Sequence, residues 1–225
     1  MKTTDIQAAI FDFDYTLADS SRGAVECINF ALKEMGLAEA SKEVACRTIG
    51  LSLKDTFLTL AGHQESRRCD EFSRLFVQRA DEVMAKLTVV YESVPPMVEA
   101  LREGGLRLGI VSTKFRYRIE EILKRETLLQ CFEVVIGGED VEQHKPHPQG
   151  LLKAVERLQC SLASIVYVGD SVADAELAKR AAVPFVVVLS GVTPREHFDS
   201  YEAVGIIESL SELPTLVGRF HRSGR

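Results

Sequence analysis

Two aspartates, Asp12 and Asp14, directly follow the first apolar run of the sequence, residues 6–11. One carboxylate of such a pair can attack phosphorus as a nucleophile, and the other can protonate the leaving group and later activate water. An acidic turn that caps the next helix would have the same composition. The pair therefore indicates phosphoryl transfer only in combination with further groups.

A second pair, Asp170 and Asp174, follows the apolar run 165–168 in the stretch Gly-Asp-Ser-Val-Ala-Asp. Mg²⁺ prefers carboxylate oxygens and keeps several of its waters, so Asp170, Asp12 and one backbone carbonyl would be enough to bind it. Asp174 lies one helical turn beyond Asp170 and is expected to support the metal ligands from behind. The alternative is that Asp170 or Ser171 only caps the helix that follows.

Lys145 and Ser112 add a cation and a hydroxyl group. Lys145 lies in the loop His-Lys-Pro-His-Pro, where two prolines stiffen the backbone. A rigidly held ammonium group can bind phosphoryl oxygens and offset crowded carboxylates, although a solvated surface lysine is the alternative. Ser112 and Thr113 follow the run 106–111, where a hydroxyl and backbone N–H groups can hold a phosphate oxygen. Helix N-caps share that composition.

Five short apolar runs alternate with segments of helical periodicity, and this alternation predicts an α/β fold with a doubly wound, mostly parallel, Rossmann-like sheet. The runs are 6–11, 106–111, 134–136, 165–168 and 184–189. Each candidate group falls after a predicted strand, and open α/β sheets bind ligands outside the carboxyl ends of their strands. We therefore expect the candidate groups to meet at one edge of the sheet.

About 90 residues separate the first two runs, far more than a crossover helix requires. Apolar residues at helical spacing over 25–35 and 72–87, with shorter segments at 42–47 and 53–60, predict that this interval is all helix. The sequence thus predicts a helical cap at residues 19–90, inserted into a catalytic core made of residues 1–18 and 91–225.

Composition limits the classes of partner. The chain has 225 residues, 46% of them hydrophobic, and a net charge of −6, which argues against a nucleic-acid partner. No apolar stretch approaches the ~20 residues that span a bilayer, so no membrane partner is expected. Five scattered cysteines and an acidic start without a secretory pattern predict a cytoplasmic protein with reduced thiols. We expect a monomer or homodimer that acts on a small phosphorylated metabolite.

The order of these groups, Asp-x-Asp, then Ser/Thr, then Lys, then Gly-Asp-x-x-x-Asp, resembles the four motifs of the haloacid dehalogenase superfamily. The resemblance covers essentially the whole chain, including a helical cap after the first motif. It implies Asp12 as nucleophile and metal ligand, and Asp14 as general acid/base that also lends a backbone carbonyl to the metal. It further implies Ser112 as a phosphoryl-binding hydroxyl, Lys145 as the charge-balancing lysine, Asp170 as a metal ligand and Asp174 as its acidic support.

Within the superfamily, the stretches DFDYTLADS, VSTK, KPHPQGLLKA and VGDSVADAELAKRA are most similar to phosphoglycolate phosphatases. This similarity implies Mg²⁺-dependent hydrolysis of a small, phosphoglycolate-like monoester through an aspartyl-phosphate on Asp12. Substrate contacts are expected from Thr113 and Lys114 in the core, and from Arg47 and Gly50 in the cap, although Arg47 could also be a solvent-exposed helix residue. One departure is Tyr15, which stands where that family usually has glycine.

Three other functions remain open. A phosphosugar mutase of the β-phosphoglucomutase type shares the cap and both aspartates of the first motif, and an inorganic pyrophosphatase is another relative. A receiver-type signalling domain also has a phospho-accepting aspartate, a hydroxyl and a lysine, but the helical insertion, Asp14 and the late Gly-Asp motif count against it. Asp14 also disfavours dehalogenation, because dehalogenases of the superfamily lack an acid/base aspartate there.

Overall fold

Parallel strands form the central sheet of the protein, whose computed structural model describes residues 5–222. In spatial order the six strands are β5 (Val134–Ile136), β4 (Arg107–Val111), β1 (Ala8–Phe11), β6 (Ile165–Gly169), β7 (Phe185–Val188) and β8 (Gly205–Ile207). The predicted doubly wound sheet is confirmed. Strand β8 lies outside the five apolar runs, because it has only three residues at the sheet edge and two of them are only partly buried.

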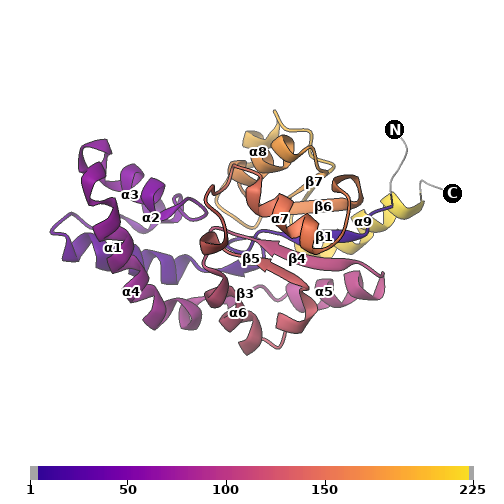
Figure 1. The fold of residues 1–225 in the computed structure, drawn as a ribbon, viewed down its shortest axis with the longest axis horizontal. Coiled ribbons are helices and arrows are strands. Elements are labelled where there is room, and N and C mark those ends of the chain that lie inside the picture. The colour runs from indigo at the N-terminus through magenta and orange to yellow at the C-terminus, as the bar shows by residue number, and fades with distance from the viewer. Residues whose placement is uncertain (1–4, 223–225) are drawn as a thin grey trace.

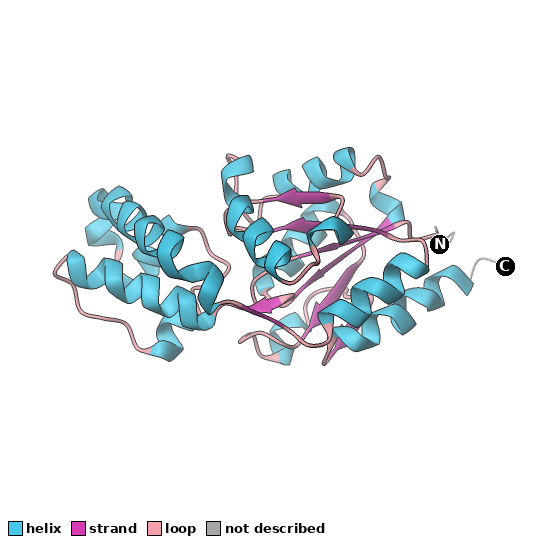
Figure 2. Ribbon diagram, turned by 90° about the horizontal axis from the view of Figure 1, so that it is seen from below, coloured by secondary structure: helices cyan, strands magenta, loops and turns pink. Residues whose placement is uncertain are grey.

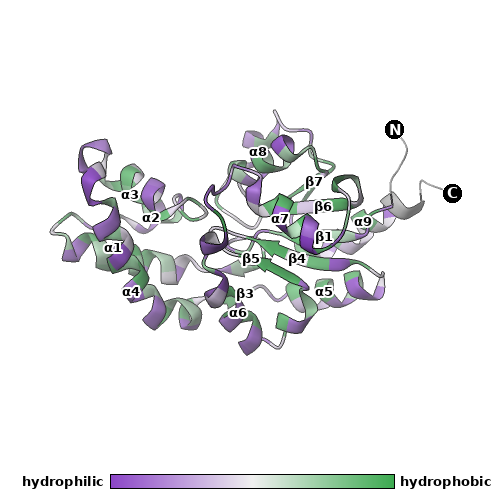
Figure 3. Ribbon diagram, in the orientation of Figure 1, coloured by the Kyte–Doolittle hydropathy of each residue, from purple (hydrophilic) through white to green (hydrophobic). Residues whose placement is uncertain are grey.

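Helices cover both faces of this sheet (Figure 2). The helices α5 (Val94–Glu103), α6 (Arg116–Arg125) and α9 (Leu213–Arg222) pack on one face, and α7 (Gln149–Arg157) and α8 (Val172–Ala181) pack on the other. The alternating side chains of β1 divide between them: Phe11 joins the first apolar cluster and Ile10 the second. Strands buried on both faces are mostly apolar, as the green of β5 and of most of β4 in Figure 3 shows.

The segment predicted as the cap, residues 19–90, contains the helices α1 (Ser21–Glu34), α2 (Lys42–Cys46), α3 (Leu53–Ala61) and α4 (Cys69–Leu87). They form a separate lobe beside the sheet (Figure 1) with an apolar cluster of its own. At its centre the rings of Phe57 and Phe72 stack with centroids 4.9 Å apart. The cap therefore has a core that is independent of the sheet.

A short antiparallel pair, β2 (Ala18–Asp19) and β3 (Val89–Val90), joins the cap to the sheet domain. Ala18 lies opposite Val90, and Asp19 opposite Val89, so the two connections run side by side between the lobes (Figure 2). Two-residue strands are too short to leave a pattern in the sequence.

Short 3₁₀ helices occupy several connections: His63–Arg68, Leu129–Cys131, Gly138–Asp140, Leu162–Ser164, Arg195–Phe198 and Leu210–Glu212. Within residues 5–222, none of the helices has both the length and the apolar composition needed to cross a bilayer.

Candidate active site

Asp12, Ser112 and Asp170 follow three neighbouring strands, β1, β4 and β6. Strand β1 pairs with β4 on one side and with β6 on the other, so Asp12 lies where the winding of the sheet reverses direction. Ligands of doubly wound sheets bind at this point. The backbone N–H of Asp12 donates to Val168 O at 2.9 Å, which ties the loop after β1 to β6. The fold therefore brings these three predicted residues to one edge.

Lys145 reaches the same edge from the loop before α7. Its Nζ lies 2.6 Å from Asp12 Oδ1 and 2.8 Å from Asp174 Oδ1, and its side chain is only 4% exposed. Carboxylate oxygens of Asp12, Asp170 and Asp174 all lie within 4.8 Å of one another. The solvated surface lysine considered above is therefore excluded, and one buried ammonium group serves a cluster of three buried carboxylates.

Burial and crowding change the pKa values in this cluster. Burial raises the pKa of Asp12 to about 7; Lys145 opposes the rise and Asp174 adds to it. Burial, followed by repulsion from Asp174 and Asp12, also raises the pKa of Asp170 well above its usual range. For Lys145, burial alone would lower the pKa, but Asp12 and Asp174 outweigh it and raise the pKa. Lys145 is therefore charged, and the carboxylates lack compensating positive charge.

The cluster fits a divalent cation. Burial and mutual repulsion raise the pKa values of Asp12 and Asp170, so an added positive charge would favour their ionised forms. Oxygen donors of this kind suit Mg²⁺. Asp174 is the least suited to bind directly, because its two oxygens already accept hydrogen bonds from Lys145 Nζ, Tyr167 OH and Ser171 Oγ. Asp12 and Asp170 are the side chains that would hold the metal.

Three residues that were not singled out from the sequence hold this cluster in place. Thr16 Oγ1 donates to Asp170 Oδ1 at 3.1 Å, and the fully buried Tyr167 donates to Asp174 Oδ1 at 2.8 Å. A Cβ atom on Gly191 would lie 1.9 Å from Asp170 Oδ2, so this glycine leaves room for the carboxylate. A hydroxyl in the otherwise apolar strand β6 could have drawn attention to Tyr167. Nothing in the sequence distinguishes Gly191.

Helix capping and the acidic cluster coexist at the start of α8. Ser171 is the N-cap residue, and its Oγ accepts from the Asp174 backbone N–H at 3.2 Å. Asp174 in turn accepts from the Ser171 backbone N–H and hydroxyl. The capping alternative therefore holds for Ser171, whereas Asp170 precedes the cap and turns toward Asp12.

Asp14 lies apart from the carboxylate cluster. Its Oδ1 is 3.0 Å from Lys114 Nζ and also accepts a hydrogen bond from Ser20 Oγ. The side chains of Asp14 and Lys114 are 8% and 6% exposed, so this is a buried ion pair. The sequence predicts Lys114 at the substrate and did not indicate this pairing. Asp14 and Lys114 both line a cavity of about 70 Å³ between core and cap, whose other walls are mostly apolar.

The two predicted cap residues, Gly50 and Arg47, share one cleft, and only Gly50 also lines the cavity at Asp14. Gly50, whose φ of 97° suits glycine, lies between α2 and α3, and its carbonyl accepts from Thr113 Oγ1 at 3.2 Å. Arg47 lines a cleft of about 500 Å³ together with Gly50, Tyr15 and Asp170. Its side chain is exposed and forms no ion pair with any of residues 5–222.

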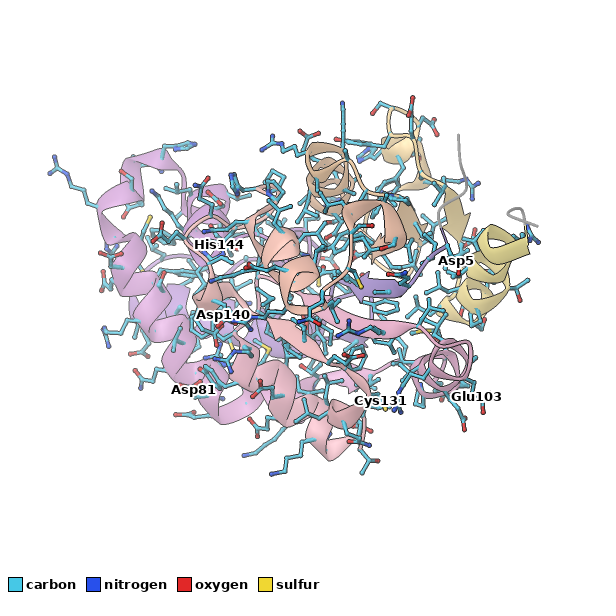
Figure 4. The ribbon with its side chains drawn as sticks, turned by 45° about the vertical axis from the view of Figure 1, so that its right-hand side comes forward. Asp5, Asp81, Glu103, Cys131, Asp140 and His144 are labelled. Carbon is cyan, nitrogen blue, oxygen red and sulfur yellow. The ribbon has the colours of Figure 1, made fainter. Side chains whose placement is uncertain are left out.

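A second contact fixes the cap to the core at α6. Asp81 of α4, labelled in Figure 4, lies 2.6 Å from the Arg118 guanidinium of α6 and accepts a hydrogen bond from Tyr117 OH. The Arg118 side chain is only 5% exposed. Figure 4 also labels His144, next to Lys145 in the loop that faces the cap. The cap thus rests on both the β4–α6 loop and α6 itself.

Comparisons with known proteins identify the family of this chain. The family model described as haloacid dehalogenase-like hydrolase matches residues 9–188. The pyrophosphatase PpaX of Anoxybacillus flavithermus is 31% identical, covering 95% of this chain and 98% of the relative. The phosphoglycolate phosphatase of Escherichia coli is 30% identical, covering 98% and 96%. A solved haloacid dehalogenase-like hydrolase from Bacteroides fragilis has a TM-score of 0.90 at 38% identity, covering 93% of this chain and 100% of that one.

Proposed function

Since this chain belongs to the haloacid dehalogenase-like hydrolases, we propose that it is a magnesium-dependent phosphatase that hydrolyses a small phosphate monoester through an aspartyl-phosphate on Asp12. One observation carries the proposal: Asp12 directly follows the central strand, lies 2.6 Å from the buried Lys145 and shares with Asp170 a cluster whose oxygen donors suit a divalent cation. A carboxylate so placed is a nucleophile beside the cations that phosphoryl transfer requires.

In the first step an Asp12 oxygen attacks phosphorus, and the bond from phosphorus to the ester oxygen breaks. Asp14 gives its proton to the departing oxygen. Lys145 and the Ser112 hydroxyl bind the phosphoryl oxygens, where their positive and polar groups offset the charge that develops. When bound, Mg²⁺ would offset the combined charge of Asp12, Asp170 and the phosphoryl group.

In the second step Asp14 takes a proton from water, and the water oxygen attacks phosphorus. The bond between phosphorus and Asp12 breaks, which releases inorganic phosphate and restores the Asp12 carboxylate. Asp14 must therefore be protonated in the first step and ionised in the second.

The leaving group is proposed to lie between the core and the cap, in the cavity that Asp14 lines. Its mostly apolar walls and small volume suit a short organic alcohol, and Lys114 supplies a cation for a carboxylate such as that of phosphoglycolate. Arg47 and the turn at Gly50 are proposed to select substrates from the cap side. Closure of the cap would exclude water during the first step.

Inorganic pyrophosphate is a second candidate substrate. It is favoured by the similarity to the pyrophosphatase PpaX and by Arg47, an exposed cation in the cleft beside Asp170 that forms no ion pair within residues 5–222. A second phosphoryl group could pair with this guanidinium.

The test is phosphate release by the full chain from phosphoglycolate, pyrophosphate and β-glucose 1-phosphate, with Mg²⁺ and with a chelator. We expect Mg²⁺-dependent release, fastest from phosphoglycolate. Preference for pyrophosphate would transfer the assignment to the second candidate. Conversion of β-glucose 1-phosphate to its 6-phosphate isomer, without net phosphate release, would instead identify a mutase. A phosphorylated Asp12 that is not turned over would point to a receiver-type protein.

A further inference from the structure

Tyr15 has an unusual backbone conformation for a bulky residue. It lies between Asp14 and Thr16 in the loop after β1, and its φ is 62°, in the left-handed region. Side chains with a Cβ atom disfavour this region, whereas glycine adopts it readily. A tyrosine here requires compensating contacts elsewhere.

Those contacts connect the core to the cap. The backbone of Tyr15 is fixed in the core, because its N–H donates to Ala18 O at 2.7 Å and its carbonyl accepts from Ser190 Oγ. The side chain is buried, with the residue only 7% exposed, and the phenol lies beside the thiol of Cys46, the last residue of α2. Burial, followed by the neighbouring Cys46, raises the pKa of Tyr15 above its usual range, so the phenol is neutral. The ring thus extends from the nucleophile loop into the cap.

Tyr15 also lies where substrate size would be limited. It forms part of the wall of the cleft between the core residues that follow Asp170 and the cap residues Arg47 and Gly50. The turn around Gly50 also lines the smaller cavity at Asp14. A ring wedged between the loop and α2 therefore sets how closely that turn approaches the nucleophile.

We propose that Tyr15 is a specificity-determining residue, whose ring fixes the spacing between the cap and the nucleophile loop and so restricts the enzyme to esters with small leaving groups. The proposal rests on the phosphatase function proposed above. Glycine at this position would leave the loop backbone relaxed and remove the spacer. The preference for small esters would then weaken.

The activity test compares Tyr15→Gly and Tyr15→Phe with the wild type on phosphoglycolate and glucose 6-phosphate. In Tyr15→Gly we expect kcat/KM for the larger ester to rise relative to the smaller one by about tenfold or more, the scale on which pocket size discriminates substrates. Tyr15→Phe keeps the ring and should keep the ratio. A residue with only a structural role would change both substrates equally, and an unchanged ratio in Tyr15→Gly overturns the proposal.

A second measurement does not depend on phosphatase activity. Maleimide labelling of Cys46, followed by mass spectrometry of the cap peptide, reports whether the ring covers this thiol. All five cysteines are free, and Cys27 and Cys69, buried inside the cap, serve as internal controls. Cys46 should react about tenfold faster in Tyr15→Gly, with both controls unchanged. Equal Cys46 rates in wild type and variant would overturn the spacing role even if the wild type hydrolyses esters. A wild type that hydrolyses no ester would refute the proposed function instead, whatever the labelling shows.

Discussion

Lys145 and Arg47 are both cations beside the acidic cluster, one in the core and the other in the cap. Lys145 is buried, with its ammonium group between Asp12 and Asp174. Arg47 is exposed in the cleft and has no ion-pair partner within residues 5–222. A charge already held by its neighbours is preorganised for a fixed reaction, whereas an unpaired one can be recruited by a ligand. The core would thus supply the chemistry, and the cap the choice of substrate.

Asp12→Asn should produce the largest effect, because the amide has no nucleophilic oxygen anion. We expect kcat to fall by about four orders of magnitude or more while the variant still folds. Phosphate release under single-turnover conditions and circular dichroism would check both parts. Turnover close to that of the wild type would remove Asp12 as the nucleophile.

Lys145→Met and Arg47→Met form a matched pair that tests the comparison directly. Removing Lys145 should lower kcat by about 10²–10³-fold, the scale of one electrostatic contact in the transition state. It should also destabilise the protein by about 3 kcal/mol, since the carboxylates it pairs with stay buried. Thermal unfolding and steady-state kinetics give the two values. An unchanged kcat would contradict a catalytic role for this lysine.

Gly191→Ala should weaken metal binding. The added methyl group would force Asp170 out of its position, since its carbon would lie 1.9 Å from Oδ2. We expect the Mg²⁺ concentration for half-maximal activity to rise about 10- to 100-fold, with kcat recovering at saturating Mg²⁺. Calorimetric titration with Mg²⁺ alone provides a binding value independent of turnover. Gly218→Ala, in α9 where an added Cβ meets nothing within 4 Å, is the control for adding a methyl group without this clash.

Lys114→Met should raise KM by about tenfold for phosphoglycolate, because the carboxylate of the substrate loses its cation. An ester with an uncharged leaving group, such as ethyl phosphate, should be less affected. The ratio of the two KM changes is the measurement. Equal KM changes for both esters would show that Lys114 pairs only with Asp14 and does not bind the substrate carboxylate.

Arg47→Met, the other half of the matched pair, should have the smallest effect. An exposed guanidinium contributes little before substrate binds, so stability should be unchanged, and KM should rise about two- to fivefold with kcat retained. The kinetics with phosphoglycolate and with pyrophosphate would be compared. A fall in kcat as large as that for Lys145→Met would show that the cap takes part in the chemistry.

The sequence predicted those parts of the molecule that depend on local patterns. Apolar runs predict the strands, and polar residues after them predict which groups the sheet edge brings together, as for Asp12 and Asp170. The partners of each group depend on distances across the fold. The pairing of Lys114 with Asp14 and the space that Gly191 leaves for Asp170 join residues about 100 and 20 positions apart, so no local pattern marks them. The positive φ of Tyr15 could not be predicted for a similar reason, because contacts that stabilise this backbone conformation come from the cap.

The antiparallel pair of β2 and β3 places the entry and exit of the cap side by side, with Ala18 opposite Val90. A segment whose ends already meet can be lengthened, shortened or replaced without moving the strands that flank it. The sheet domain can therefore stay unchanged while the cap, as an inserted domain, is replaced. Grafting the cap of a relative at these two positions would transfer its leaving-group preference while Asp12 and Asp170 stay where they are.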